Sequence, residues 1–203
     1  MANNEQIEKY LTLANRARSE NNSEDAKKYY DMIRTEDPDN KEARFFYPYY
    51  RLWEAKKGEW YQVYIDFCNA AINLIRSLEN EDAALVSEIF NAVKTLPASA
   101  SRVQMELFQT GANQSQYNAQ NKHCQKIGIE FMYKFGDEID KNFKGTDTAK
   151  IAADIWKQGV SYQQQWPYCG VDKASAETYI AKIKKYDPNF EPPKKAGCIS
   201  FAK

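Results

Sequence analysis

The sequence predicts an all-α protein, and three observations support this fold class. Apolar residues recur at helical spacing along almost the whole chain, and no stretch alternates as a half-buried strand does. Glycine is scarce, with 8 in 203 residues, and most prolines mark the ends of periodic segments. We therefore expect one domain over 1–188, an antiparallel array or bundle of about eight helices, followed by a flexible Pro/Lys-rich tail over 189–203.

Three helices are expected in the first 60 residues. An apolar stripe that starts at Ile7 indicates the first, and Ser23 is predicted to cap the second. The second helix ends at Asp37 and Pro38, because proline cannot continue a helix. Lysines followed by Gly58 are typical of a helix C-terminus and end the third. The expected bounds are about 4–20, 24–36 and 41–57.

The next two helices have the clearest apolar faces. The first of them is expected over 59–79, and the second is expected over 82–96 with Pro97 closing it. One face of the first carries Tyr61, Tyr64, Ile65, Cys68, Ala71, Ile72, Ile75 and Leu78. Both faces have the width of a stripe that packs against a protein core.

The second half of the chain is also helical in pattern. Segment 99–143 is predicted as one long helix or as two helices broken near Gly111. Further helices are expected over 147–165 and 172–186, and Pro188 follows the last of them.

An amide-rich segment lies inside this half. Seven of the fifteen residues over 112–126 are Asn or Gln. We interpret Asn113 to Gln125 as a solvated helix face, because amide side chains are mostly exposed. The alternatives are a hydrogen-bonding surface between helices and a face for self-association, so a homo-oligomer stays open.

Charge and hydropathy argue against two classes of partner. The 28 basic residues equal the 28 acidic ones, so the chain lacks the surplus positive charge that nucleic-acid binding uses. No apolar run reaches the length of a membrane span. The opening MANNEQIEKY is polar and unlike a signal peptide, so we expect a cytoplasmic location.

Catalytic and metal-binding patterns are missing from the sequence. The four cysteines, Cys68, Cys124, Cys169 and Cys198, are widely separated, and His123 is the one histidine. This spacing fits no compact zinc site, and no nucleophile, phosphate-loop or metalloprotease motif occurs. We therefore expect no enzyme activity, no metal and no cofactor. Cys68 and Cys124 are interpreted as small buried side chains.

The first two expected helices resemble a tetratricopeptide repeat, a 34-residue helix–turn–helix unit. Six residues match its spacing of aromatic, leucine, small and proline positions: Tyr10, Leu13, Ala14, Ala26, Tyr30 and Pro38. Ala17 departs from the pattern, where a tyrosine is usual, and the following register fits poorly. The resemblance implies one TPR-like unit over about 7–40. Since three repeats normally make a stable solenoid, the rest must fold as a helical array of its own kind.

More of the chain is similar to a group of uncharacterised bacterial proteins. Those begin with such a repeat, continue through an aromatic helix, and approach their end with a KIKKYDP segment and a KKxGC junction. The matching residues here are Phe45, Phe46, Tyr47, Tyr49, Tyr50, Lys182, Ile183, Lys184, Lys185, Tyr186, Asp187, Pro188, Gly197 and Cys198. This similarity implies a bacterial TPR-like helical protein and no particular chemistry.

A partner-binding groove is the function that the resemblance implies. In a tetratricopeptide array the first helix of each pair lines the concave groove, which would place there Leu11, Asn15, Arg18, Phe45, Tyr49, Leu52 and Trp53. An aromatic groove with a polar rim suits a peptide helix or an extended segment. The alternative is that these aromatics form the core. The sequence thus predicts a non-catalytic scaffold or adaptor for a protein or peptide partner, with a small-ligand- or metal-binding helical bundle as the alternative.

Overall fold

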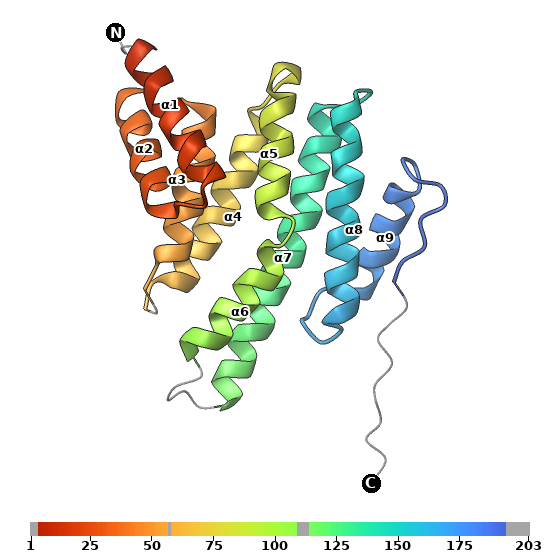
Figure 1. Ribbon diagram of the computed structural model, residues 1–203. Coiled ribbons are helices and arrows are strands. Elements are labelled where there is room, and N and C mark those ends of the chain that lie inside the picture. Colours follow the sequence, from red (N-terminus) through yellow and green to blue (C-terminus); the bar gives the residue numbers. More distant parts are fainter. Residues whose placement is uncertain (1–3, 57, 109–113, 194–203) are drawn as a thin grey trace. The chain divides into compact units, whose positions relative to one another are not determined.

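The computed structural model describes residues 4–56, 58–108 and 114–193 (Figure 1). Within these ranges the regular structure is helical and no strand occurs, so the all-α prediction is confirmed. The first helices are α1 (Asn4–Ser19), α2 (Ser23–Glu36), α3 (Lys41–Glu54) and α4 (Trp60–Arg76). They are followed by η1 (Asn80–Asp82), α5 (Ala83–Val93), α6 (Leu96–Phe108), α7 (Gln114–Asn142), η2 (Asp147–Ala149), α8 (Lys150–Gln165) and α9 (Lys173–Ile183). None of the described helices combines the length and apolar character that crossing a bilayer requires.

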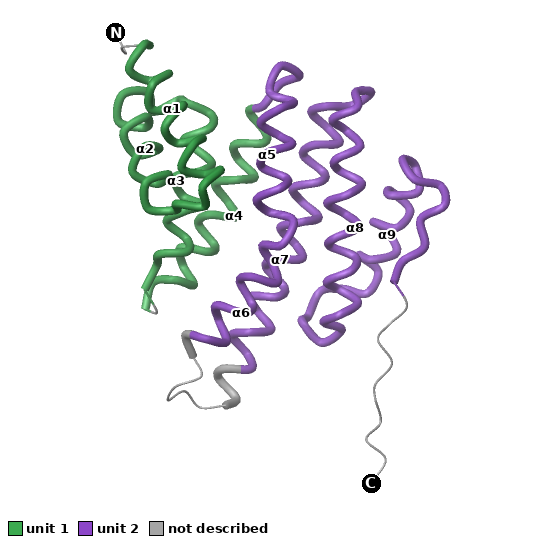
Figure 2. Tube along the Cα trace, viewed as in Figure 1, with its two compact units in different colours: residues 1–77 green, residues 78–203 purple. Residues whose placement is uncertain are grey.

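Contacts within the chain separate it into two compact units, residues 1–77 and 78–203 (Figure 2). In the first unit, α1 packs against α2, α2 against α3, and α3 against α4. In the second unit, α6 packs against α7, α7 against α8, and α8 against α9. Apart from α5, which contacts η1, η2 and α8, each of these helices packs against its neighbour in sequence within its unit. The single domain expected over 1–188 stays a prediction.

Helix caps in the first unit differ slightly from the prediction. The side chain of Asn22, not Ser23, caps α2, and its Oδ1 accepts a hydrogen bond from the Asp25 backbone N–H at 3.1 Å. Asn40 caps α3 in the same way, accepting from the Ala43 N–H at 3.0 Å. Asparagine and serine are equally good caps, so composition alone did not distinguish Asn22 from its neighbour.

One further expectation for the second unit is corrected, and one open alternative is decided. Pro97 does not close the fifth helix: α5 ends at Val93, and Pro97 lies in the first turn of α6, where a missing N–H costs no hydrogen bond. Segment 99–143 contains most of α6 and all of α7, which agrees with the two-helix alternative. The proposed break at Gly111 and residues 194–203 of the tail predicted over 189–203 lie outside the described residues.

Part of the amide-rich segment bonds to α6 instead of facing water only. The Ser101 hydroxyl donates to Oδ1 of Asn121 at 3.0 Å, and Nε2 of Gln104 donates to Oε1 of Gln120 at 3.2 Å. Gln104 is fully buried, so its amide needs a partner inside the unit. One of the alternative interpretations, a hydrogen-bonding surface between helices, therefore describes this part of α7.

Helices α7 and α8 approach closely because each presents a glycine to an aromatic ring of the other. A Cβ added at Gly159 would lie 2.7 Å from Cε1 of Tyr133, and one at Gly136 would lie 2.6 Å from Cδ1 of Trp156. The indole N–H of Trp156 donates to the backbone carbonyl of Tyr133 at 3.3 Å. The two glycines thus allow two large buried rings to lie directly against the backbone of the facing helix.

Helix α9 is held by polar contacts to α7. Oδ2 of Asp137 accepts from the Tyr179 hydroxyl at 2.9 Å, and Oδ1 accepts from Nζ of Lys182 at 2.7 Å. The Tyr186 hydroxyl donates to Oδ1 of Asp140. Desolvation and this hydrogen bond raise the pKa of Tyr186 to about 12, so the hydroxyl keeps its proton at neutral pH.

Replacing Asp137 by asparagine is expected to loosen α9. The neutral side chain loses its ionic bond to Lys182 and accepts one hydrogen bond where the carboxylate accepts two, at a cost of about 1 kcal/mol for a half-exposed pair. Hydrogen exchange of the α9 amides should become about fivefold faster. Asp154→Asn is the matched control, because its partner Lys157 keeps an ion pair with Asp187. Equal exchange in both variants would show that Asp137 does not hold α9.

Candidate functional site

Helix α3, in the first unit, has one face in the core and another that lines a surface pocket. Phe45, Phe46 and Leu52 point into the core, where each is at most 1% exposed. A second face begins at Arg44 and continues at the spacing i+3, i+4 and i+7. These residues line a pocket: Arg44, Tyr47, Pro48 and Arg51. The same short helix therefore builds the core on one side and a surface site on another.

The seven residues predicted to line a groove divide into two groups. Phe45 and Leu52 are 1% and 0% exposed, so they have almost no surface to offer a partner. For these two, the alternative interpretation as core describes the structure. The remaining five keep some surface: Leu11, Arg18, Tyr49 and Trp53 are half-buried and Asn15 is exposed.

Arg18 and Asn15 belong to a polar network that joins α1, α2 and α3. Nη1 of Arg18 donates to Oδ1 of Asn15 at 3.1 Å and approaches Oε1 of Glu42 at 3.4 Å. The Tyr30 hydroxyl donates to the same Glu42 oxygen at 2.7 Å. The Arg18 guanidinium also lies 3.6 Å from the ring centroid of Phe46. Burial, followed by the Glu42 carboxylate, raises the pKa of Tyr30, so its hydroxyl stays a donor.

Tyr49, Tyr50 and Trp53 form what we name the aromatic face of α3. All three are half-buried. The Tyr49 ring lies edge-on to Tyr50, with centroids 5.4 Å apart, and edge-on to Trp53, with centroids 5.9 Å apart. Desolvation raises the pKa of both tyrosines. Tyr49 stacks on the buried ring of Phe45, with centroids 5.9 Å apart, and Tyr50 stacks on the buried ring of Tyr30, with centroids 6.3 Å apart.

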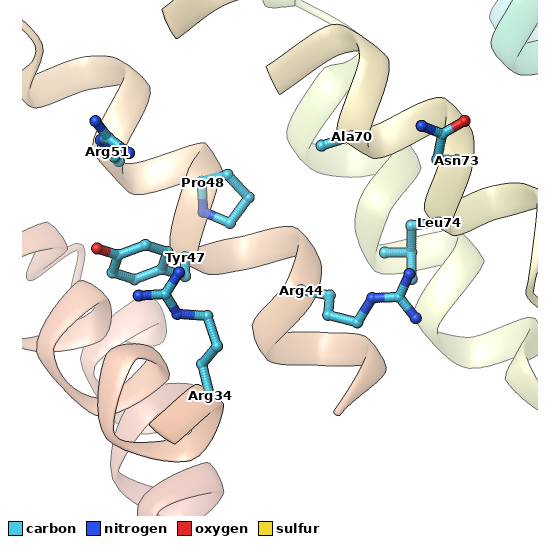
Figure 3. Close-up of a pocket in the computed structure, with 8 residues that line it drawn as sticks. All are labelled: Arg34, Arg44, Tyr47, Pro48, Arg51, Ala70, Asn73 and Leu74. Atoms are coloured by element: carbon cyan, nitrogen blue, oxygen red, sulfur yellow. The ribbon is translucent and has the colours of Figure 1, made fainter. Parts of the chain in front are cut away.

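The pocket on the Arg44 face of α3 has a volume of about 390 Å³ (Figure 3). We name it the arginine pocket and define it by its lining: Arg34, Arg44, Tyr47, Pro48, Arg51, Ala70, Asn73 and Leu74. Arg34 comes from α2, the next four come from α3, and the last three come from α4. The Arg34 guanidinium lies 4.0 Å from the ring centroid of Tyr47, close enough for a cation–π contact.

Sequence reasoning missed the arginine pocket. A signal for part of it was present, because Arg44, Tyr47, Pro48 and Arg51 share one helical face. The aromatic residues between them drew attention to the opposite side. The contributions of Arg34 and Leu74 depend on how α2 and α4 pack against α3, and no local pattern shows this.

Metal-binding side chains do not converge in the part of the chain that is described. Within it, no three His, Cys, Asp or Glu side chains gather where an ion could be held. Cys68, Cys124 and Cys169 are buried, and desolvation raises the pKa of Cys124 to about 12. Cys198 lies outside the described residues. Comparison of the chain with protein-family models, with curated proteins and with solved structures finds no match.

Proposed function

We propose that this protein is a non-catalytic interaction module that binds a protein or peptide segment over the aromatic face of α3. The observation that carries the proposal is the cluster of three half-buried rings on two adjacent turns, Tyr49, Tyr50 and Trp53. Tyrosine and tryptophan are enriched at interface hot spots, because a large rigid ring loses little entropy on binding.

The surroundings of the aromatic face support the same use. The central ring, Tyr49, stacks on the buried ring of Phe45, which helps to fix its orientation before a partner arrives. The Arg18 network holds α1 beside α3 and adds a polar rim. The tetratricopeptide resemblance implies that the first helices of successive pairs line a groove, and by that resemblance these would be α1 and α3. The binding surface we propose is therefore Leu11, Asn15, Arg18, Tyr49 and Trp53, with Tyr50 added.

The test is a selection of random displayed peptides against the full chain, followed by affinity measurement of the selected peptide. Trp53→Ala should weaken its binding at least tenfold, as truncation of an interface hot spot does. Tyr168→Ala is the control, because Tyr168 is the large aromatic that is 78% exposed in the second unit. Circular dichroism verifies that both variants keep their helices.

Two results would contradict the proposal. Either the selected peptides bind the folded Trp53→Ala variant as tightly as the original chain, or Tyr168→Ala weakens binding as much. In both cases the aromatic face would not be the binding surface.

A further inference from the structure

The arginine pocket presents positive charge that the fold does not neutralise. None of its lining residues is acidic. Within the described ranges, Arg44 and Arg51 pair with no carboxylate, while Nη2 of Arg34 bonds to Oδ1 of Asp31 at 2.9 Å. Three guanidinium groups against the one Asp31 carboxylate leave a local charge of +2 in a chain whose net charge is 0. Arginine keeps its charge at any physiological pH, so the pocket selects for an anion.

The floor between the arginines is apolar and offers one further donor. Tyr47, Pro48 and Leu74 supply apolar surface, and Figure 3 shows the Pro48 ring between Arg51 and Arg44, with Leu74 beside the Arg44 guanidinium. Oδ1 of Asn73 accepts from Arg76 at 3.2 Å, which leaves its Nδ2 to donate to a ligand. A ligand that fits must therefore bring anionic groups, a hydrogen-bond acceptor and some apolar surface. A peptide with acidic side chains has all three.

The spacing of the arginines matches an extended chain. Arg44 and Arg51 lie two turns apart on α3, so their Cα atoms are separated by about 10 Å along the helix axis. Three residues of an extended peptide cover about the same length. Acidic residues at alternate positions would place carboxylates on one side of such a peptide, within reach of both long side chains. The guanidinium fork matches a carboxylate in geometry and charge.

We propose that the arginine pocket binds an extended acidic peptide segment, whose carboxylates pair with Arg44 and Arg51 while its backbone lies over Tyr47 and Pro48. A nucleic acid offers phosphates to the same groups, but phosphate-driven binding draws its affinity from many contacts, and the pocket supplies three arginines. The pocket faces away from the aromatic face of α3, so this inference goes beyond the proposed function and does not depend on it.

The experiment measures fluorescence anisotropy of a labelled peptide with the full chain at 50 mM salt. The probe alternates glutamate and alanine over nine residues, and the matched peptide carries glutamine for every glutamate. The glutamate peptide should bind at least tenfold more tightly than the glutamine peptide, and Arg44→Gln/Arg51→Gln should remove most of that difference. The control is Arg16→Gln/Arg102→Gln, which lowers the net charge equally at two exposed arginines outside the pocket. Trp53→Ala should leave binding of the acidic peptide unchanged, which separates this test from that of the aromatic face.

Several outcomes would overturn the inference. The pocket is not the site if the control variant loses as much affinity as Arg44→Gln/Arg51→Gln, or if the two peptides bind alike. Tighter binding of inorganic phosphate or of a ten-residue thymidine oligonucleotide, with the same dependence on Arg44 and Arg51, would assign the pocket to phosphate instead. Arg44 and Arg51 are exposed and glutamine is a good helix former, so α3 should stay folded; the single variant Arg51→Gln repeats the test if the double variant unfolds.

Discussion

Replacement of Phe45 by alanine is expected to lower the free energy of unfolding by about 3–5 kcal/mol, the range for a large aromatic removed from a core. Phe45 is 1% exposed, and its ring lies 4.9 Å from that of Phe46 and 5.6 Å from that of Phe67 in α4. The cavity would open between α3 and α4, where neighbouring rings are too rigid to fill it. Urea unfolding followed by circular dichroism measures the loss, and hydrogen exchange should place it in residues 1–77.

The same variant distinguishes core from groove. If Phe45 lined a groove, its truncation would cost affinity for a partner and little stability. Leu11→Ala is the control from the same predicted set, because Leu11 is half-buried and should cost about 1 kcal/mol. If Phe45→Ala lost less stability than Leu11→Ala, Phe45 would not be packed in the core between α3 and α4.

The sequence predicted where the helices lie better than it predicted which helices pack against each other. Helical periodicity was enough to place α1 to α5, since each buries a stripe that repeats every three or four residues. Pro97 was misplaced because proline both follows one helix and starts the next, and the pattern alone does not say which. A hydrogen-bonding surface between helices was one alternative for Asn113 to Gln125, but an amide that faces a partner helix looks in sequence like one that faces water.

The candidate site was predictable only in part. The aromatic segment of α3 identified the right helix, yet large residues lie on every side of it, and the side that becomes core depends on where α2 and α4 pack. This is why Phe45 and Leu52 are buried while Tyr49 and Trp53 reach the surface. The arginine pocket joins three helices, so its existence follows from tertiary packing and not from any one segment.

Replacement of Gly159 by alanine is expected to destabilise the second unit, although alanine is the better helix former by about 1 kcal/mol. The new Cβ would lie 2.7 Å from Cε1 and 2.9 Å from Cδ1 of Tyr133. That ring has no room to move, because it stacks on Tyr179 with centroids 3.8 Å apart and its hydroxyl donates to Oε1 of Gln163 at 2.6 Å. The cost of overpacking against a fixed ring exceeds the gain in helix propensity, so we expect the free energy of unfolding to fall by about 1–3 kcal/mol.

A double-mutant cycle shows that the clash with Tyr133 is the cause. In a Tyr133→Ala background the ring is gone, and Gly159→Ala should become neutral or stabilising, which gives a coupling energy of at least about 1 kcal/mol. Gly58→Ala is the control, because nothing lies within 4 Å of a Cβ placed there and its effect should stay within about 0.5 kcal/mol. Urea unfolding measures all four members of the cycle. An equal loss from Gly159→Ala in both backgrounds would mean that the clash with Tyr133 is not the cause, and that α7 and α8 do not pack closely through this glycine.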